Sequence, residues 1–275
     1  MTNIRHCGHT WLILLLTILL LPGLSARTQA EDDIKAHKTP PQRVRVGVYP
    51  FSPFAEYDDQ GQLRGMAQRL IAILNQHQQQ LTFEAVPVSP KRRYQAYLNQ
   101  DVDAFLYENM KWGWARRNID IRASQPYQSG GELYIAQAAP GRDQRFFEQL
   151  QQRHLVGILG YHYGFAGYNS DETFLRDNYQ ITLTWDNQKV LDLLQRGHGD
   201  VALMSEAYWQ RFVQQNPAKA SQFLVSEKYD QHYSHSILIR PQLLGQHQLD
   251  NLVREITRRR DFRQLILDYG ISPHQ

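Results

Sequence analysis

Cysteine is almost absent from this 275-residue chain: Cys7 is the only one, so no disulfide can form within a molecule. The chain also lacks a strong excess of one charge, because 30 Lys and Arg residues face 27 Asp and Glu residues and leave a formal charge of +3. So small and evenly spread a charge argues against nucleic acid as a partner. The longest apolar stretch, residues 11–21, is too short for a membrane-spanning helix, which needs ~20 residues.

The N-terminal segment has the layout of a secretory signal peptide. Arg5 is the only charge before the apolar stretch, and small residues around Ala26 offer a cleavage site. We therefore expect a signal peptide over residues 1–26 and a periplasmic mature chain, with Ala30 as an alternative cleavage position and an uncleaved membrane anchor as the alternative role. Removing Cys7 would leave a thiol-free chain, which suits an oxidising compartment. Residues 27–42 are polar, end in prolines, and are predicted to form a flexible leader.

From residue 43 onward, short β-rich runs alternate with helical periodicities, which is typical of an α/β fold with mainly parallel strands. The expected strands cover residues 43–48, 81–86 and 104–107 in a first set, and 155–159, 181–185 and 201–204 in a second. A further strand is predicted at 236–239, and helices are expected around 66–74, 90–99, 146–153 and after Gly164. Because the same strand and helix order occurs twice, the pattern indicates two lobes.

Five motifs then occur in a characteristic order. They are Y-P-F-S-P-F at 49–54 followed by D-Q-G-Q-L-R-G at 59–65, D-V-D-A at 101–104, S-Q-P-Y at 124–127 and G-D-V-A at 199–202. Their order and spacing resemble the family 3 extracellular solute-binding proteins, the periplasmic receptors of polar amino acid uptake systems. The resemblance covers residues 43 to 271.

The resemblance implies a two-lobed periplasmic-binding-protein type II fold, in which two α/β lobes are joined by two crossing strands. These strands would include residues 132–137 and 235–239, so that residues 43–132 and 234–275 form lobe 1 and residues 133–233 form an inserted lobe 2. A small-molecule ligand would lie between the lobes of a monomer, without a cofactor. The implied partner is an inner-membrane ABC permease, or a sensor kinase or cyclase.

Several residues of lobe 1 are candidates for ligand contact. Tyr49 and Phe51 follow a strand at its carboxyl end, where open α/β sheets place ligands. The alternative is that their rings cover the sheet edge. Arg93, at the start of the second helix, matches a P-x-x-R pattern of more distant family members, and the alternative is an exposed helix charge.

The segment after the third strand supplies Glu108, Trp112 and Arg116. In the amino acid receptors it reads G-M-T-x-T-P-x-R, and its threonine and arginine hold the ligand's α-carboxylate. Arg116 stands where that arginine would be, so it is expected to clamp a carboxylate, with a structural ion pair as the alternative. Gly113 stands in place of the threonine.

In lobe 2, Tyr161 and Tyr163 lie in a glycine-bounded turn that leads into a helix, a natural anion site. The alternative is a plain turn. The receptors' ammonium-binding aspartate corresponds by counting from Asp200 to Ser205. The adjacent Glu206 is expected to replace it, unless it is only an N-terminal helix charge.

The overall expectation is a solute-binding protein for an amino acid or related compound, used for import or sensing, and not an enzyme. No catalytic or nucleotide-binding motif occurs, and His232 and His235 lack further neighbours at metal-ligand spacing, so no metal is expected. Two alternatives remain. One is an elimination enzyme like the periplasmic cyclohexadienyl dehydratases, with Glu108 or Glu206 as the acid. The other is a regulatory protein that has lost ligand binding.

Overall fold

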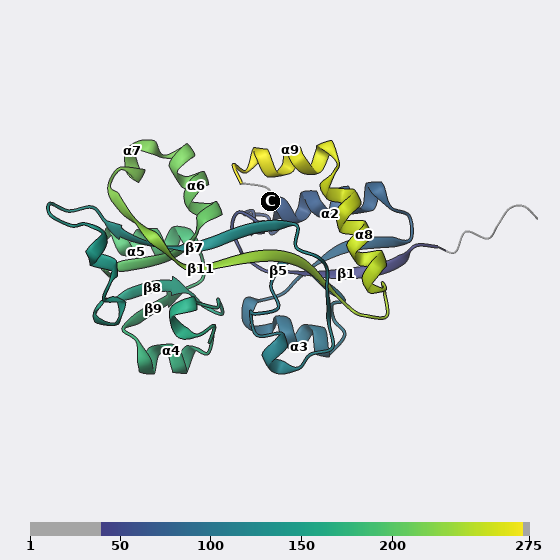
Figure 1. The fold of residues 1–275 in the computed structure, drawn as a ribbon, viewed down its shortest axis with the longest axis horizontal. Coiled ribbons are helices and arrows are strands. Elements are labelled where there is room, and N and C mark those ends of the chain that lie inside the picture. Colours follow the sequence, from purple (N-terminus) through teal and green to yellow (C-terminus); the bar gives the residue numbers. More distant parts are fainter. Residues whose placement is uncertain (1–39, 272–275) are drawn as a thin grey trace, which may run out of the picture. The chain divides into compact units, whose positions relative to one another are not determined.

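Residues 40–271 are described by a computed structural model of the chain (Figure 1). The expected signal peptide over residues 1–26 and nearly all of the expected leader over 27–42 lie outside these residues. No helix between residues 40 and 271 combines the length and the apolar character needed to cross a bilayer.

The first lobe is built on a sheet whose central strand is β1 (Gln42–Val48). Its valines Val44, Val46 and Val48 are buried, as expected for alternating β-branched residues. β1 pairs in parallel with β4 (Leu81–Pro87) and with β5 (Ala104–Glu108). The shorter strands are β2 (Glu56–Tyr57), β3 (Leu63–Arg64) and β6 (Arg122–Ala123).

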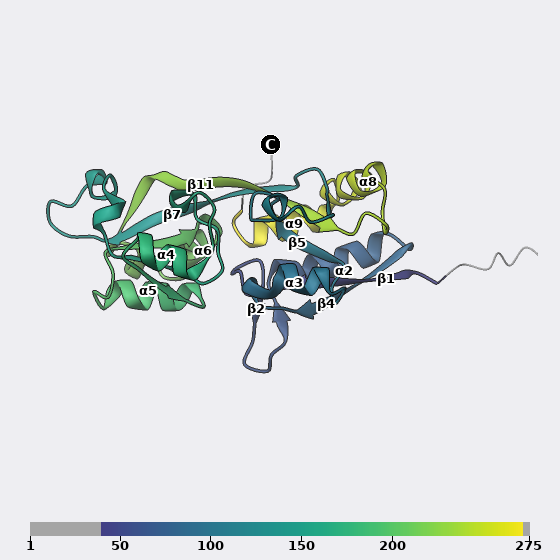
Figure 2. The ribbon, with the colours of Figure 1, turned by 90° about the horizontal axis from the view of Figure 1, so that it is seen from below.

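Helices cover both faces of this sheet. They are α2 (Met66–His77), α3 (Arg93–Leu98), α8 (Gln246–Thr257) and α9 (Arg260–Asp268), with 3₁₀ turns η1 (Pro90–Arg92) and η2 (Ala115–Arg117). The turn η1 begins where the sequence predicts, because the side chain of Ser89 accepts a hydrogen bond from the Arg92 N–H. Figure 2 shows α2, α8 and α9 gathered around the same sheet, and α2 packs on β4 and touches both C-terminal helices.

The second lobe repeats the arrangement around another sheet. Its parallel strands are β8 (Leu155–Ile158), β9 (Ile181–Thr184) and β10 (Val201–Ser205), and its helices are α4 (Glu172–Asn178), α5 (Asn187–Gln195), α6 (Glu206–Gln215) and α7 (Pro217–Ala220). The helix expected over 146–153 is instead two 3₁₀ turns, η3 (Gln144–Phe147) and η4 (Leu150–Gln152). After Gly164 the chain forms only the 3₁₀ turn η5 (Gly164–Ala166) before α4 begins.

Two long antiparallel strands join the lobes. They are β7 (Gln128–Gln137) and β11 (Phe223–Ile239), which stay paired from Phe223 opposite Gln137 to His235 opposite Gln128. The strand order β4-β1-β5-β11-β7-β10-β8-β9 makes them the centre of the combined sheet, and Figure 1 shows both ribbons running from one lobe to the other. The two-lobed α/β fold with crossing strands is therefore confirmed. The sequence predicted only the end of β11, since register shifts between Val225 and Gln231 interrupt its alternation.

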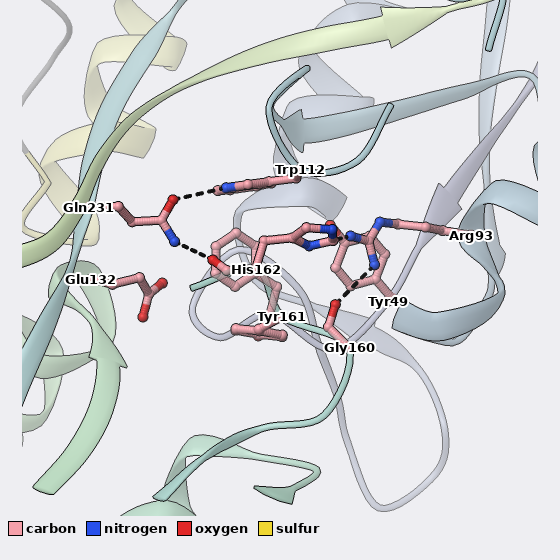
Figure 3. Close-up of a pocket in the computed structure, with 9 residues that line it drawn as sticks. Tyr49, Arg93, Trp112, Glu132, Gly160, Tyr161, His162 and Gln231 are labelled. Atoms are coloured by element: carbon pink, nitrogen blue, oxygen red, sulfur yellow. Dashed lines mark hydrogen bonds between the residues drawn. The ribbon is translucent and has the colours of Figure 1, made fainter. Parts of the chain in front are cut away.

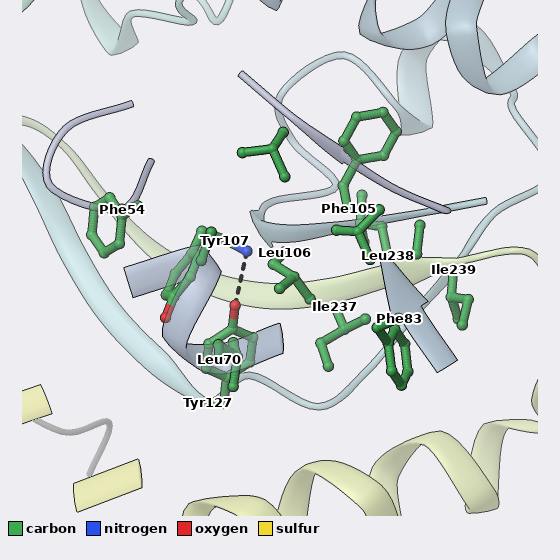
Figure 4. Packing of buried hydrophobic residues seen from close by; sticks show 14 of the residues in the cluster. Phe54, Leu70, Phe83, Phe105, Leu106, Tyr107, Tyr127, Ile237, Leu238 and Ile239 are labelled. Carbon is green, nitrogen blue, oxygen red and sulfur yellow. Dashed lines mark hydrogen bonds between the residues drawn. The ribbon is translucent and has the colours of Figure 1, made fainter. Parts of the chain in front are cut away.

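Separate apolar cores stabilise the lobes. The core of the first lobe packs Phe54, Leu70 and Phe105 between the sheet and its helices (Figure 4). In the same core the Tyr107 backbone N–H donates to the Tyr127 hydroxyl at 2.8 Å, so a buried polar group is satisfied there. Two further clusters lie in the second lobe.

Candidate ligand-binding site

A pocket lies where the two lobes meet near the crossing strands. Its cavity volume is about 20 Å³, which is room for about one water molecule, so a larger solute requires the lobes to move apart. The first lobe contributes loop residues that follow β1 and β5 and the start of α3. The crossing strands contribute Glu132 of β7 and Gln231 of β11, and the second lobe contributes the loop after β8. The lining residues, drawn in Figure 3, are Tyr49, Phe51, Arg93, Trp112, Glu132, Gly160, Tyr161, His162 and Gln231.

Behind the wall of this pocket, Arg93 and Glu108 form a buried ion pair. Arg93 is 2% exposed and Glu108 is fully buried, with 3.3 Å between Arg93 Nε and Glu108 Oε1. Glu108 also accepts hydrogen bonds from Tyr49 Oη at 2.5 Å and Trp114 Nε1 at 3.0 Å. Burial raises the pKa of Glu108, while the charge of Arg93 opposes that shift. The charge on Arg93 is therefore compensated from within the first lobe.

The remaining donors of Arg93 are also occupied by the chain. Nη1 donates to the backbone carbonyls of Pro90 and Gly160, and Nη2 donates to Tyr94 Oη at 2.8 Å and lies 3.0 Å from His162 Nδ1. Burial, followed by the nearby charge of Arg93, lowers the pKa of His162 to about 2. The imidazole is therefore neutral, and the geometry assigns Nδ1 as the acceptor. Both Nη groups are thus used by the chain, whereas Nε, 3.3 Å from Glu108 Oε1, is buried and makes no hydrogen bond within the described part of the chain.

A hydrogen-bond network continues from this point across the lobes. The Tyr94 hydroxyl donates to the Trp112 carbonyl and lies 3.1 Å from His162 Nε2. Trp112 Nε1 donates to Gln231 Oε1 at 3.2 Å, and Gln231 Nε2 donates to the His162 carbonyl. Tyr161 Oη donates to the Pro50 carbonyl at 3.2 Å. These polar side chains of the pocket thus already have partners.

Glu132 is different. It lies in the middle of β7 and is 3% exposed, yet within residues 40–271 its carboxylate has no hydrogen bond or ion pair. Figure 3 shows it pointing toward Tyr161, with no bond drawn to it. Burial, followed by the negative charge of Asp230, raises the pKa of Glu132 well above its usual range. A buried polar group without a partner is rare and calls for an explanation.

Aromatic rings form much of the remaining wall. The ring centroid of Phe51 lies 5.4 Å from that of Tyr161 and 5.9 Å from that of Trp112, both in edge-on contacts. The Arg93 guanidinium lies 5.3 Å from the Tyr49 ring centroid. Phe51, Trp112 and Tyr161 therefore surround the space with ring surfaces that hold no charge.

Of the ligand-binding residues expected from the sequence, five line this pocket: Tyr49, Phe51, Arg93, Trp112 and Tyr161. Glu108 lies one layer behind them.

Arg116 does not reach the pocket. Its side chain is exposed and donates to the carbonyls of Gly167 and Tyr168 in the second lobe, at 3.3 and 3.0 Å. Gly113, which stands where amino acid receptors have threonine, has a φ of +85°. A Cβ there would meet Tyr94 Oη at 2.7 Å, so no side chain fits. The expected carboxylate clamp is not assembled.

Tyr163 and Glu206 are also placed elsewhere. Tyr163 is fully buried in the core of the second lobe, where its hydroxyl accepts a hydrogen bond from the Ile158 N–H at 2.6 Å. Glu206 begins α6 and accepts a hydrogen bond from Tyr229 Oη at 2.8 Å. Tyr163 lies in the loop between β8 and η5, from which its ring packs into that core, and Glu206 lines a separate hollow beside β7.

Sequence reasoning missed Glu132, His162 and Gln231. The available signal for Glu132 was a carboxylate directly before the apolar run 133–136, in a segment already expected to be a crossing strand. For His162 and Gln231 the chain gave no comparable signal, since their roles arise from contacts between lobes. Among the described residues, no three His, Cys, Asp or Glu side chains lie close enough to hold a metal ion.

No protein-family model matches the chain, and no curated protein sequence is significantly similar to it. Solved structures are similar. A mutant of the arginine-binding protein ArgBP from T. maritima has a TM-score of 0.61 at 18% identity, covering 87% of this chain and 98% of its own. A substrate-binding protein of an ABC uptake transporter from Streptococcus pneumoniae, with bound histidine, has a TM-score of 0.63 at 12% identity, covering 83% and 92%.

A third similar structure is an ancestral amino acid-binding protein described as a precursor of cyclohexadienyl dehydratase. Its TM-score is 0.62 at 18% identity, and the match covers 82% of this chain and 95% of the ancestral one. Identities this low speak to the fold alone. The chain has the two-lobed fold of the amino acid-binding proteins of ABC transporters.

Proposed function

We propose that the chain is a periplasmic solute-binding protein that captures a small polar solute between its two lobes. The observation that carries this proposal is the pocket itself, because residues of both lobes line it within a fold otherwise used for amino acid capture. The expected signal peptide supports the periplasmic location. An ABC permease or a sensor protein is the partner that such a receptor would serve.

The mechanism follows from the two-sided lining. Phe51 and Trp112 belong to lobe 1, which we propose comprises residues 43–132 and 234–275, whereas Tyr161 and His162 belong to lobe 2, residues 133–233. A solute that touches both sets of residues binds the closed arrangement better than the open one, so it shifts the population toward closure. The paired strands β7 and β11 are the connection about which the lobes would move.

We propose that the chain is not an enzyme. The carboxylates that elimination chemistry was expected to use, Glu108 and Glu206, do not line the pocket. Glu132 is the one carboxylate on the wall. Formation of product from arogenate or prephenate by the wild-type chain, and its loss in Glu132→Gln, would overturn this part of the proposal.

Binding can be tested with a thermal-shift panel of amino acids, amines and organic acids on the mature protein. A solute at 100 times its Kd stabilises the native state by ~2.7 kcal/mol, which raises the Tm by roughly 5–11 °C for a chain of this size. We expect at least one such solute. Trp112→Leu, which removes a ring from the wall, should reduce the shift.

The matched control is Trp185→Leu. Trp185 is 72% exposed and lines a hollow that shares only Tyr161 with this pocket, so its replacement should leave the shift unchanged. No shift with any solute, or a shift lost only in the control, would contradict the proposed site and support a protein that acts without a ligand in this pocket.

A further inference from the structure

The charged groups of the pocket do not balance. Arg93 and Glu108 compensate each other, and His162 is a neutral imidazole held by Arg93. Glu132 is left as the only charged group on the wall without an opposite charge. An ionised carboxylate in such a place is strongly disfavoured unless a cation pairs with it. The pocket therefore has an unused site for one positive charge.

The same pocket has no site for a carboxylate. Both Nη groups of Arg93 are hydrogen-bonded to the chain and its Nε is buried beside Glu108, while Arg116 is exposed and bonded to carbonyls outside the pocket. Gly113 brings no hydroxyl group, and neighbouring side chains fill the space beside it. An amino acid bound here would place its carboxylate among aromatic rings and Glu132 without a compensating cation.

The position of Glu132 shows how the pocket can offer a cation site although Ser205 stands in place of the receptors' ammonium-binding aspartate. Glu132 of β7 is the cross-strand partner of Ser205 in β10, the position that corresponds by counting to the receptors' ammonium-binding aspartate. Paired residues of neighbouring strands project to the same face of a sheet. The carboxylate of Glu132 therefore lies one strand away from that position, and on its other side Glu132 pairs with Gln231 of the pocket wall.

The rings complete the site. Phe51, Trp112 and Tyr161 present aromatic surface around the space that Glu132 faces. Aromatic faces attract cations and also accept the carbon skeleton of an organic ligand.

Resting on the solute-binding function proposed above, we propose that the ligand is a small organic cation, an amine that has no carboxylate. Its positive charge pairs with Glu132, and its carbon skeleton lies against Phe51, Trp112 and Tyr161. The narrow space between the walls, about 20 Å³ in this arrangement, favours a small amine.

The test uses matched pairs in which the amine is the decarboxylated form of the amino acid: isobutylamine and valine, putrescine and ornithine, agmatine and arginine, tyramine and tyrosine. Calorimetric titration of the mature protein should show at least one amine that binds tenfold or more tightly than its amino acid. Glu132→Gln should weaken that amine by tenfold or more, since a hydrogen bond to a charged group is lost. Glu132→Asp, which keeps the charge, should retain part of the affinity.

The control with the same change of charge is Glu255→Gln, because Glu255 is exposed on α8 and away from the pocket. It should bind the amine like the wild type. Circular dichroism of each variant without ligand verifies folding, and Glu132→Asp provides a second reading if Glu132→Gln does not fold.

The outcomes separate the two proposals. Amino acids that bind as tightly as their amines, or an amine that binds Glu132→Gln and wild type equally, overturn the cation inference while solute capture stands. Failure of every compound, in these pairs and in the wider panel, overturns solute capture and this inference with it.

Discussion

Replacing the unpaired carboxyl of Glu132 by an amide should change how stability depends on pH. In the unfolded chain this carboxyl ionises near pH ~4.3, whereas burial and Asp230 raise its pKa well above that in the folded protein. Between these two values only the unfolded chain releases the proton, so rising pH favours unfolding of the wild type. Glu132→Gln has no such proton, and it should gain stability relative to the wild type as the pH rises.

The size of the effect follows from linkage. A difference of one bound proton changes stability by at most ~1.4 kcal/mol per pH unit. The difference in stability between Glu132→Gln and the wild type, called the gap below, can therefore grow by up to ~3 kcal/mol from pH 5 to pH 7. That corresponds to a Tm difference of at most about 6–12 °C. Well below pH ~4 the Glu132 carboxyl is protonated in both the folded and the unfolded chain, so the gap should be constant.

Other titrating groups near Glu132 must be considered. Asp230 lies on β11 and has a raised pKa of its own, and burial raises the pKa of Tyr161, Tyr163 and Tyr233. Apart from their coupling to residue 132, they contribute equally to both proteins, so they largely cancel in the difference.

Scanning calorimetry of wild type, Glu132→Gln and Glu255→Gln without ligand, from pH 4 to pH 8, measures the gap. Glu255 is exposed, and its variant should run parallel to the wild type. If the difference in stability between Glu132→Gln and the wild type stays constant or narrows as the pH rises, the Glu132 carboxyl is paired or solvated in the folded protein, which contradicts a raised pKa.

Three further predictions concern Arg93, Gly113 and Arg116. Arg93→Met should destabilise the chain by ~3–5 kcal/mol in urea unfolding because Glu108 is left buried without its partner, and adding Glu108→Gln should recover part of that loss; equal stability of the single and double variants would contradict the ion pair. Gly113→Ala should lower the Tm more than Gly61→Ala, because both glycines have positive φ but only Gly113 has atoms within 3 Å of the new Cβ; equal losses would mean that the crowding is absent. Arg116→Ala should change solute affinity by less than ~5-fold in calorimetry, since exposed hydrogen bonds contribute little. A loss of about a hundredfold would instead support a carboxylate clamp by Arg116.

Much of the fold could be predicted because local patterns carry it. The alternating valines of β1 and the apolar stripe of α2 mark a strand and a helix without reference to any other part of the chain. The long strand β11 was mostly missed because it contains register shifts, and its polar residues are buried by pairing with β7 rather than by their own character.

The residues of the site likewise fall into those that a local pattern predicts and those that depend on long-range contacts. The aromatic loop with Tyr49 and Phe51 could be predicted from its place after a strand. Arg93 was expected at the cleft, but its neutralisation by Glu108 depends on packing that no local pattern reports. Glu132 was missed because its role depends on the neighbouring strand. Counting along the sequence identifies Ser205 as the equivalent of the receptors' aspartate, and only the pairing of β7 with β10 places the Glu132 carboxylate beside Ser205.

Solute capture in this pocket is tested most directly by a calorimetric titration of the mature protein with small polar solutes, repeated on Trp112→Leu and Trp185→Leu. We expect at least one solute to bind with one-to-one stoichiometry and only Trp112→Leu to weaken its binding. No heat of binding from any solute, or equal binding to both variants, would contradict the assignment of this pocket as the site of capture.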